Sequence, residues 1–291
     1  MEQKKLITIL VPAYNEEEVL YMLYERLKKL MDENTKYDFE ILLINDGSKD
    51  NTFKIMQELR MKDTRVCYLN LSRNFGKETA MIAGLDYCNG DAVVIIDADL
   101  QDPPELIPEM IKYWEEGFDD VYAKRRSRKG ESWLKKFTST MYYKVLQSFT
   151  KITIQKDTGD FRLLDRRCIE ALKSIRESQR YTKGLFSWIG YNKKEILYDR
   201  DPRAAGKTKW NYKKLVDLSI DGITSFTTSP LRWSAVLGIL VSIAGFIYMI
   251  AIIIKTLVSG VDVPGYASTM VVILFLGGFQ LIFLGVIGEY L

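Results

Sequence analysis

AVVIIDADLQDPP, at residues 92–104, is the stretch of sequence that decides the fold. Its first five residues are apolar and mostly β-branched, which predicts a buried strand. The two prolines end strand pairing and favour the start of a helix directly afterwards. Asp97 and Asp99 are two residues apart, and side chains two apart on an extended chain share one face. We therefore expect both carboxylates to point at one place, at the carboxyl end of a central strand.

Two carboxylates at one place are costly unless a cation lies between them. A hard divalent metal fits this position, because it takes oxygen ligands from the protein and from a substrate phosphate. Asp97, Asp99 and Gln101 are therefore candidate metal ligands. The alternative is a helix cap in a solvated turn, which we favour only for Asp102.

The composition narrows the chemistry. The chain has 291 residues, enough for one α/β domain with an addition, and its net charge of +3 implies no nucleic acid partner. It has no histidine, which excludes a His-based triad, a His general base and His metal ligands. Acid–base and metal chemistry must therefore rest on carboxylates. The three cysteines lack metal-binding spacing and fit a reducing compartment.

Two uncharged runs of 22 residues, 233–254 and 267–288, predict a membrane region. Each exceeds the roughly 20 residues that a helix needs to cross a hydrocarbon core. The chain before them is rich in Lys and Arg, so the positive-inside rule places it in the cytoplasm. We expect a multi-pass protein of the inner or plasma membrane, without a signal peptide because its first residues are polar. A basic tail more often follows such a span, so we expect the natural chain to continue past Leu291.

Strands and helices alternate in the first half of the chain. Apolar patterning predicts strands at 6–11, 39–44, 66–70 and 92–96, and helices at about 19–31, 51–61 and 78–88. This order predicts a doubly wound α/β sheet, followed by an edge strand at 120–123. Polar loops at the carboxyl ends of the strands should line the ligand crevice, and these are residues 12–16, 46–48 and 97–101.

The segments that follow are basic. Residues 124–136 contain seven basic residues and one acidic one, and residues 192–214 contain eight and three. An aromatic stripe opposite lysines predicts an interfacial helix at 131–150, although a core-facing helix is the alternative. A polar segment at 201–210 predicts a mobile loop. The expected domains are thus a cytoplasmic domain at 1–210, a juxtamembrane helix at 211–230 and a two-span region at 231–291.

The sheet lacks the usual nucleotide-binding glycine signatures. No G-x-G-x-x-G follows the first strand and no P-loop is present, which weakens NAD-dependent and ATPase interpretations. Other motifs occur in order, namely PAYNEE at 12–17, DGS at 46–48, RNFGK at 73–77, the 97–104 stretch and GDFR at 159–162. Together they resemble glycosyltransferase family 2, and the two predicted spans make the chain similar to the polyprenyl-phosphate glycosyltransferases of that family.

This resemblance implies a GT-A (Rossmann-like) fold and a reaction. The reaction is an inverting transfer of a sugar from a nucleotide-diphosphate sugar, either UDP-glucose or UDP-N-acetylglucosamine, to undecaprenyl phosphate or another polyprenyl phosphate. Mg²⁺ or Mn²⁺ is the implied cofactor, bound at Asp97, Asp99 and Gln101 with the diphosphate. The resemblance also implies a homo-oligomer assembled through the spans, where glycines allow close helix contact.

The resemblance also implies roles for single residues. The implied nucleotide-binding residues are Pro12, Tyr14, Asn15, Glu16, Asp46, Ser48, Lys77 and Asp97, with a solvated helix start as the alternative for Lys77. The implied residues for the lipid phosphate are Arg125, Arg126, Arg128, Arg203, Lys207 and Lys209, with generic attraction to anionic headgroups or a solvated surface charge as the alternative. Asp99 is placed with the catalytic residues, and Asp157 and Asp160 are both candidates for a base or orienting group. A lipid phosphate is already ionised near neutral pH, so it needs alignment more than deprotonation.

Two other functions stay open at the level of sequence. A processive polysaccharide synthase of the same superfamily shows more spans and a Gln-x-x-Arg-Trp motif, which residues 179–181 match poorly. A non-catalytic, membrane-tethered nucleotide-sugar sensor would not need the acidic cluster and the arginines together. Turnover with a lipid phosphate acceptor separates these functions.

Overall fold

The computed structural model describes residues 4–126, 158–175, 182–199, 228–259, 265–288 and 290. The chain forms two compact units, Met1–Asp221 and Gly222–Leu291. The predicted interfacial helix at 131–150 and nearly all of the predicted juxtamembrane helix at 211–230 lie outside the described residues.

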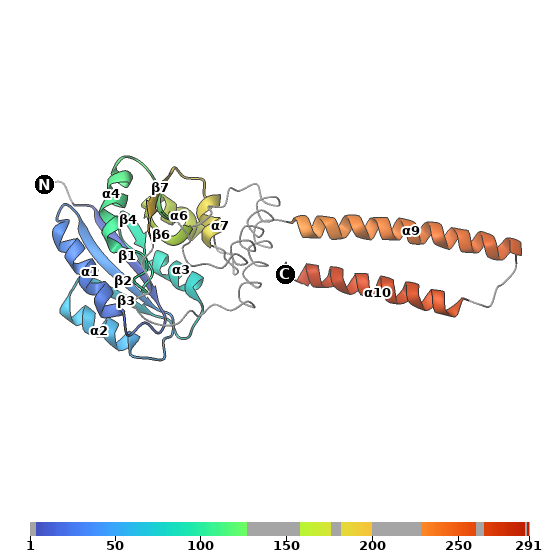
Figure 1. The fold of residues 1–291 in the computed structure, drawn as a ribbon, viewed down its shortest axis with the longest axis horizontal. Coiled ribbons are helices and arrows are strands. Elements are labelled where there is room, and N and C mark those ends of the chain that lie inside the picture. The colour runs from blue at the N-terminus through green and yellow to red at the C-terminus, as the bar shows by residue number, and fades with distance from the viewer. Residues whose placement is uncertain are drawn as a thin grey trace. The chain divides into compact units, whose positions relative to one another are not determined.

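A seven-stranded sheet forms the centre of the first unit (Figure 1). Its strands are β1 (Leu6–Ala13), β2 (Asp38–Asn45), β3 (Val66–Asn70), β4 (Ala92–Ile95), β5 (Asp120–Arg125), β6 (Thr158–Asp165) and β7 (Lys193–Tyr198). They lie in the order β3-β2-β1-β4-β6-β5-β7. The first four strands are mutually parallel, β6 is antiparallel to both β4 and β5, and β7 is parallel to β5.

Helices cover both faces of this sheet (Figure 1). They are α1 (Leu20–Glu33), α2 (Thr52–Lys62), α3 (Lys77–Tyr87), the short η1 (Pro104–Leu106), α4 (Ile107–Glu115), α6 (Arg166–Ser174) and α7 (Thr182–Trp188). Helices α1, α2 and α4 bury apolar stripes in the core cluster that contains Ile7, Ile9 and Val11 of β1. Helix α3 covers the opposite face, where a Cβ on Gly84 would lie 2.5 Å from Leu10 of β1. Alternate side chains of β1 therefore pack into the apolar layers on the two faces of the sheet.

Two features of the sheet differ from the sequence prediction. The doubly wound sheet is mixed rather than all parallel, because β6 inserts antiparallel between β4 and β5. The strand predicted at the edge, β5, is an inner strand, because β7 adds to its other side from Lys193 onward. The sequence also predicts a strand within 184–198, which β7 confirms, although no local pattern gives its place beside β5.

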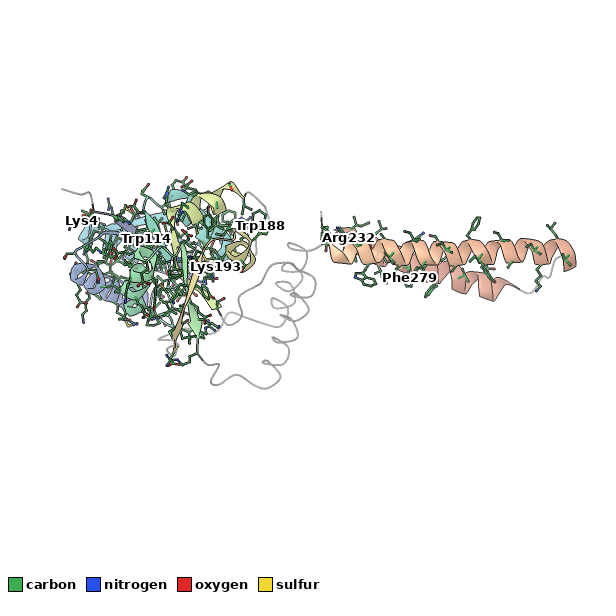
Figure 2. The ribbon with its side chains drawn as sticks, turned by 90° about the horizontal axis from the view of Figure 1, so that it is seen from above. Lys4, Trp114, Trp188, Lys193, Arg232 and Phe279 are labelled. Atoms are coloured by element: carbon green, nitrogen blue, oxygen red, sulfur yellow. The ribbon has the colours of Figure 1, made fainter. Side chains whose placement is uncertain are left out.

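The second unit contains two helices, α9 (Ser229–Ser259) and α10 (Tyr266–Gly288). Figure 2 labels Arg232 near the start of α9 and Phe279 on α10. Within the unit, a Cβ on Gly238 of α9 would lie 3.8 Å from the ring of Phe283. Among the described residues, one helical segment, Leu231–Tyr248, is long and apolar enough to cross a membrane. The apolar segment found in α10, Phe275–Gly288, is shorter than a span, so the second span stays a prediction.

Candidate active site

Three parallel strands deliver polar residues to the same edge of the sheet. Ala13 at the end of β1 pairs with Asn45 at the end of β2, and the end of β4 lies beside β1 on its other side. The loops after these strands carry the three predicted segments, 12–16, 46–48 and 97–101. The prediction that these loops share one edge is confirmed.

The loops after β1 and β2 brace each other. The Asn15 backbone N–H donates to Ser48 Oγ at 3.0 Å, and Asn15 Oδ1 accepts from the Lys49 N–H at 2.8 Å. Asn15 has a φ of 52°, a left-handed conformation that asparagine tolerates better than most residues. Beside this turn lies an open pocket of about 350 Å³, lined by Asn15, Glu16, Glu17, Glu18, Val19, Lys49 and Asp50. Pro12 is buried within β1 and Tyr14 is half-buried after it.

Asp46 fixes the loop that precedes α3. Its two carboxylate oxygens accept the backbone N–H groups of Phe75 at 2.8 Å and Gly76 at 3.0 Å. Burial raises the pKa of Asp46 above its usual value, although these two hydrogen bonds act in the opposite direction. At the next position, Gly47 has a φ of 65°, and a Cβ there would lie 2.3 Å from the carbonyl carbon of Arg73. Through these two hydrogen bonds, Asp46 holds the loop before α3 in place.

That loop delivers Lys77, the first residue of α3, to two carboxylates. Lys77 Nζ lies 2.5 Å from Asp97 Oδ1 and 2.5 Å from Asp160 Oδ2. Burial alone would lower the pKa of Lys77, but the charges of Asp160 and Asp97 outweigh it, and the pKa is raised. The site therefore contains a charged ammonium between two acidic side chains, one from the loop after β4 and one from β6.

The loop after β4 has the donor atoms for a divalent cation. Asp99 is 7% exposed, and its Oδ1 accepts the Gln101 N–H at 3.2 Å. Leu100 between them has a φ of 58°, so the backbone turns sharply at this point. No group of three acidic, Cys or His side chains is gathered for a metal within the described residues. The oxygen atoms of Asp97, Asp99 and Gln101 are the hard donor type that a divalent cation takes.

A buried network lies beside this loop. Tyr198, the last residue of β7, donates its hydroxyl to Asp102 Oδ1 at 2.5 Å. Burial and the charge of Asp102 raise the pKa of Tyr198, while a hydrogen bond that Arg125 donates to the Tyr198 oxygen acts in the opposite direction. Gly159 lies next to this network, since a Cβ there would lie 3.8 Å from Arg125 Nη2 and 4.0 Å from Asp102 Oδ2. Arg125 is thereby held at the end of β5 beside the acidic loop.

The comparisons with known proteins decide the family. The model of "Glycosyl transferase family 2" matches residues 8–173, and the model of the "GtrB C-terminal hairpin" matches residues 229–291. The chain belongs to glycosyltransferase family 2. The uncharacterised glycosyltransferase sll0501 of Synechocystis is 52% identical, over 98% of this chain and 89% of its own. The bactoprenol glucosyl transferase of Shigella phage SfV is 45% identical, over 98% and 92%.

The fold of this family 2 glycosyltransferase also matches a solved structure. Glucosyl-3-phosphoglycerate synthase from Mycobacterium tuberculosis aligns with a TM-score of 0.51 at 18% identity, covering 76% of both chains. The likeness shows that the first unit has a GT-A-like α/β fold, as the sequence predicted, built here on a mixed sheet. The match of the family model to residues 8–173 confirms the predicted resemblance to glycosyltransferase family 2.

The structure brings only some of the predicted site residues of this glycosyltransferase together. Asp97, Asp160 and Lys77 form one cluster, and Asn15 and Ser48 form another. Arg126 is exposed and pairs with Asp199 at 3.4 Å, away from that cluster's contacts. Arg128, Asp157, Arg203, Lys207 and Lys209 lie outside the described residues.

Sequence reasoning missed buried residues of β5, β6 and α7 that pack together next to Asp160. Arg162, two residues after Asp160 on β6, is fully buried and lies 3.1 Å from Asp120 Oδ2 of β5. Its guanidinium carbon also lies 3.8 Å from the ring centroid of Phe186 on α7. A charged residue between Phe161 and Leu163 was the available signal for Arg162, whereas nothing in the sequence indicated its partners.

Proposed function

We propose that this protein transfers a sugar from a nucleotide-diphosphate sugar to the phosphate of a polyprenyl lipid, with inversion at the sugar carbon. The observation that carries the proposal is the joining of Lys77, Asp97 and Asp160 at the strand ends of a family 2 domain. The match of the whole chain to proteins named bactoprenol glucosyl transferase supports a lipid phosphate as the acceptor. The hairpin match at residues 229–291 favours this acceptor over a growing polysaccharide.

The nucleotide end of the donor would lie over the loops after β1 and β2. Tyr14, Asn15, Glu16 and Ser48 belong to these loops, and Pro12 lies near the end of β1. The 350 Å³ pocket beside Asn15 is open to a base or ribose. Asp46 would act by holding residues 75 and 76 in place. UDP-glucose and UDP-N-acetylglucosamine are the donors that we propose. UDP is also the nucleotide in the solved glucosyl-3-phosphoglycerate synthase complex.

The diphosphate would lie at the loop after β4. Asp97, Asp99 and Gln101 would hold Mg²⁺ or Mn²⁺ there, and such an ion stabilises the charge on a departing diphosphate. Asp99 would keep its orientation through the bond from the Gln101 N–H. Lys77 would hold Asp97 and Asp160 close to each other.

The acceptor would approach from the arginine side. Arg125, held by Tyr198, would bind the lipid phosphate, and Arg126, Arg128, Arg203, Lys207 and Lys209 are further candidates. Guanidinium forks bind phosphate oxygens in pairs. The phosphate is already ionised, so Asp160 or Asp157 would orient it or accept its residual proton.

We propose that residues 1–210 form the cytoplasmic catalytic domain, that 211–230 form a juxtamembrane helix and that 231–291 cross the membrane twice. Leu231–Tyr248 supports the first span, and the uncharged run at 267–288 supports the second. The product would then form on the cytoplasmic face of the inner or plasma membrane, for use in cell-envelope glycosylation. Glycines in the second run would allow helix contacts in a homo-oligomer.

Turnover tests this function directly. The full chain is reconstituted in lipid with undecaprenyl phosphate, Mn²⁺ and a panel of labelled nucleotide sugars, and labelled lipid is measured. We expect product with one UDP-sugar, and its loss by at least about a hundredfold in Asp99→Asn, because electrostatic stabilisation of a transition state is worth about that much. Asp38→Asn, an exposed aspartate at the opposite end of β2, is the matched control and should keep full activity. Nucleotide binding without lipid product for any donor would rule out the proposed reaction.

A further inference from the structure

Lys77 makes contacts that a nucleotide-binding lysine does not need. Its ammonium lies 2.5 Å from a carboxylate oxygen of Asp97 and 2.5 Å from one of Asp160, and its side chain is 39% exposed. Asp97 lies in the loop after β4 and Asp160 lies on β6, and their side chains are 24% and 9% exposed. Lys77 thus links the loop after β4 to β6 through two ion pairs.

The strand register explains why a cation is needed at this point. In the antiparallel pair of β4 and β6, Ala92 lies opposite Asp165 and Ile95 lies opposite Arg162. Beyond this pair, Asp97 follows two residues after the end of β4, and Asp160 precedes Arg162 by two residues on β6. An oxygen of each lies 2.5 Å from the same Lys77 Nζ, and like charges this close repel each other unless a cation lies between them. A cation between them removes this repulsion, and Lys77 is that cation in the described part of the chain.

The position of Lys77 is built by backbone contacts. Both oxygens of Asp46 hold the N–H groups just before α3, and Gly76 has a φ of 93°, which few other residues adopt. Gly47 also packs closely against the backbone of Arg73, which lies in the same loop before α3. A solvated helix start would need none of these contacts, so the alternative reading of Lys77 is disfavoured.

We propose that Lys77 is a positioning residue, the resident counter-ion of the Asp97–Asp160 pair, and that it limits metal binding until the donor diphosphate is present. The inference rests on the proposed function in one respect, since it takes Asp97 as a metal-facing carboxylate. Lys77 neutralises part of the acidic charge at the loop after β4. A divalent ion therefore meets a weaker site in the absence of the diphosphate, whose own oxygens supply the missing negative charge.

Metal binding without nucleotide tests this proposal in the full chain. Mn²⁺ affinity is measured by calorimetry for the wild type, Lys77→Met, Lys77→Gln and Lys77→Arg, with folding checked by thermal unfolding. Removing the ammonium should strengthen Mn²⁺ binding by about tenfold or more in Lys77→Met and Lys77→Gln, because one repelling charge is lost. Lys77→Arg keeps the charge and should bind as the wild type does. Lys54→Met, an exposed lysine in the first turn of α2, is the matched control and should also be unchanged.

A second measurement uses the wild type alone. Mn²⁺ should bind at least about tenfold more tightly with UDP than without it, since the diphosphate restores the negative charge. Unchanged or weaker Mn²⁺ binding in the folded Lys77→Met or Lys77→Gln protein would overturn the proposal, as would equal wild-type affinity with and without UDP. If the wild type makes labelled lipid while these results fail, the counter-ion role is wrong and the proposed function stands. If no lipid forms but the Mn²⁺ results hold, the counter-ion role of Lys77 stands and the proposed function is wrong.

Discussion

Tyr198 donates its hydroxyl to the buried carboxylate of Asp102 at 2.5 Å, and the two residues are separated by 96 positions in the sequence. Asp102 is 1% exposed and follows directly on the loop that carries Asp97, Asp99 and Gln101. Tyr198 ends β7, and Arg125 of β5 hydrogen-bonds to it. The bond therefore connects the acidic loop to Arg125, for which we propose a role in binding the acceptor phosphate.

Tyr198→Phe should weaken both stability and turnover. It removes one buried donor from Asp102, and such a loss costs about 1–3 kcal/mol in folding free energy. We also expect a rise in KM for the lipid acceptor, because Arg125 loses a partner that holds it. Thermal unfolding and acceptor titrations measure the two effects. Tyr122→Phe removes a longer, exposed bond of 3.4 Å to Glu195 and is the control, expected to change neither by a measurable amount.

The elements of the sheet could be predicted because their apolar residues recur at the strand and helix periods. Leu20, Leu23, Leu27 and Leu30 mark the buried side of α1, and its observed start lies one residue from the prediction. The order of the strands could not be predicted in the same way. Insertion of β6 between β4 and β5 depends on pairing between residues about seventy positions apart, such as Ala92 and Asp165, and no local pattern encodes it.

The site, like the fold, could be predicted from the sequence only in part. Loops at the strand ends were predicted as the crevice because parallel strands place them at one edge. The partners within the site were not predicted, since Lys77 and Asp160 are 83 residues apart and Arg162 and Asp120 are 42 apart. Charge type alone cannot say which acid a lysine will meet.

Arg162→Met should be among the most damaging single changes outside the reacting groups. It leaves Asp120 buried with only Lys193, at 4.0 Å, as a remaining ionic partner in the described structure. Removing one member of a buried pair costs about 3–5 kcal/mol, and the melting temperature should fall by on the order of 10 °C. Combining it with Asp120→Asn should recover part of this loss. Arg167→Met, at a side chain that is 67% exposed, should cost less than about 1 kcal/mol.

Gly47→Ala should disturb the site through the backbone. Its φ of 65° strains any side chain, and the added Cβ would lie 2.3 Å from the Arg73 carbonyl carbon. The loop to Lys77 must then shift, so we expect weaker nucleotide binding as well as a lower melting temperature. Gly117→Ala has a similar strain, with a φ of 98°, but meets nothing within 4 Å. It should lower stability by about 1–2 kcal/mol without affecting nucleotide binding, and equal effects of the two changes on binding would contradict the loop's role.

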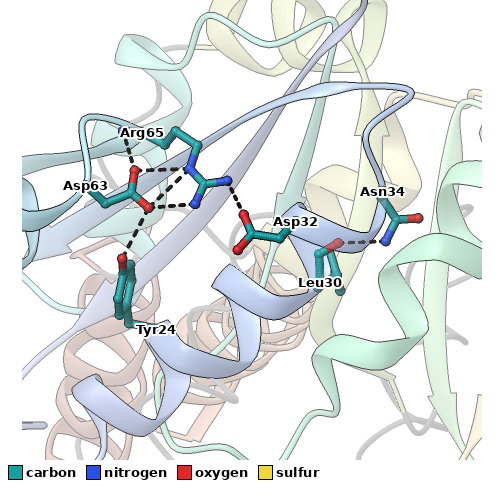
Figure 3. Close-up of polar contacts among 6 residues, drawn as sticks. All are labelled: Tyr24, Leu30, Asp32, Asn34, Asp63 and Arg65. Carbon is teal, nitrogen blue, oxygen red and sulfur yellow. Dashed lines mark hydrogen bonds and ion pairs between the residues drawn. The ribbon is translucent and has the colours of Figure 1, made fainter.

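Asp63 makes stability depend on pH at a place remote from the reacting loops. Figure 3 shows its carboxylate between Arg65 and Tyr24, with Asp32 on the far side of the arginine. Hydrogen bonds from Arg65, more than its charge, lower the pKa of Asp63 to about 2. A carboxyl whose pKa is lower in the folded state stabilises the fold above its unfolded pKa, and this stabilisation is lost as the pH falls through the folded value.

Asp63→Asn should therefore destabilise the protein at pH 7 by about 2 kcal/mol, from a pKa lowered from 3.8 to about 2. At pH 3 the difference from the wild type should shrink to about half, because the carboxylate of the unfolded chain is then largely protonated. Thermal unfolding of both proteins from pH 7 to pH 3 measures the difference. Asp38→Asn, at an exposed aspartate, should show no such convergence. A destabilisation that stays constant over this range would mean that packing, rather than the charge of Asp63, holds α1 and the turn before β3 together.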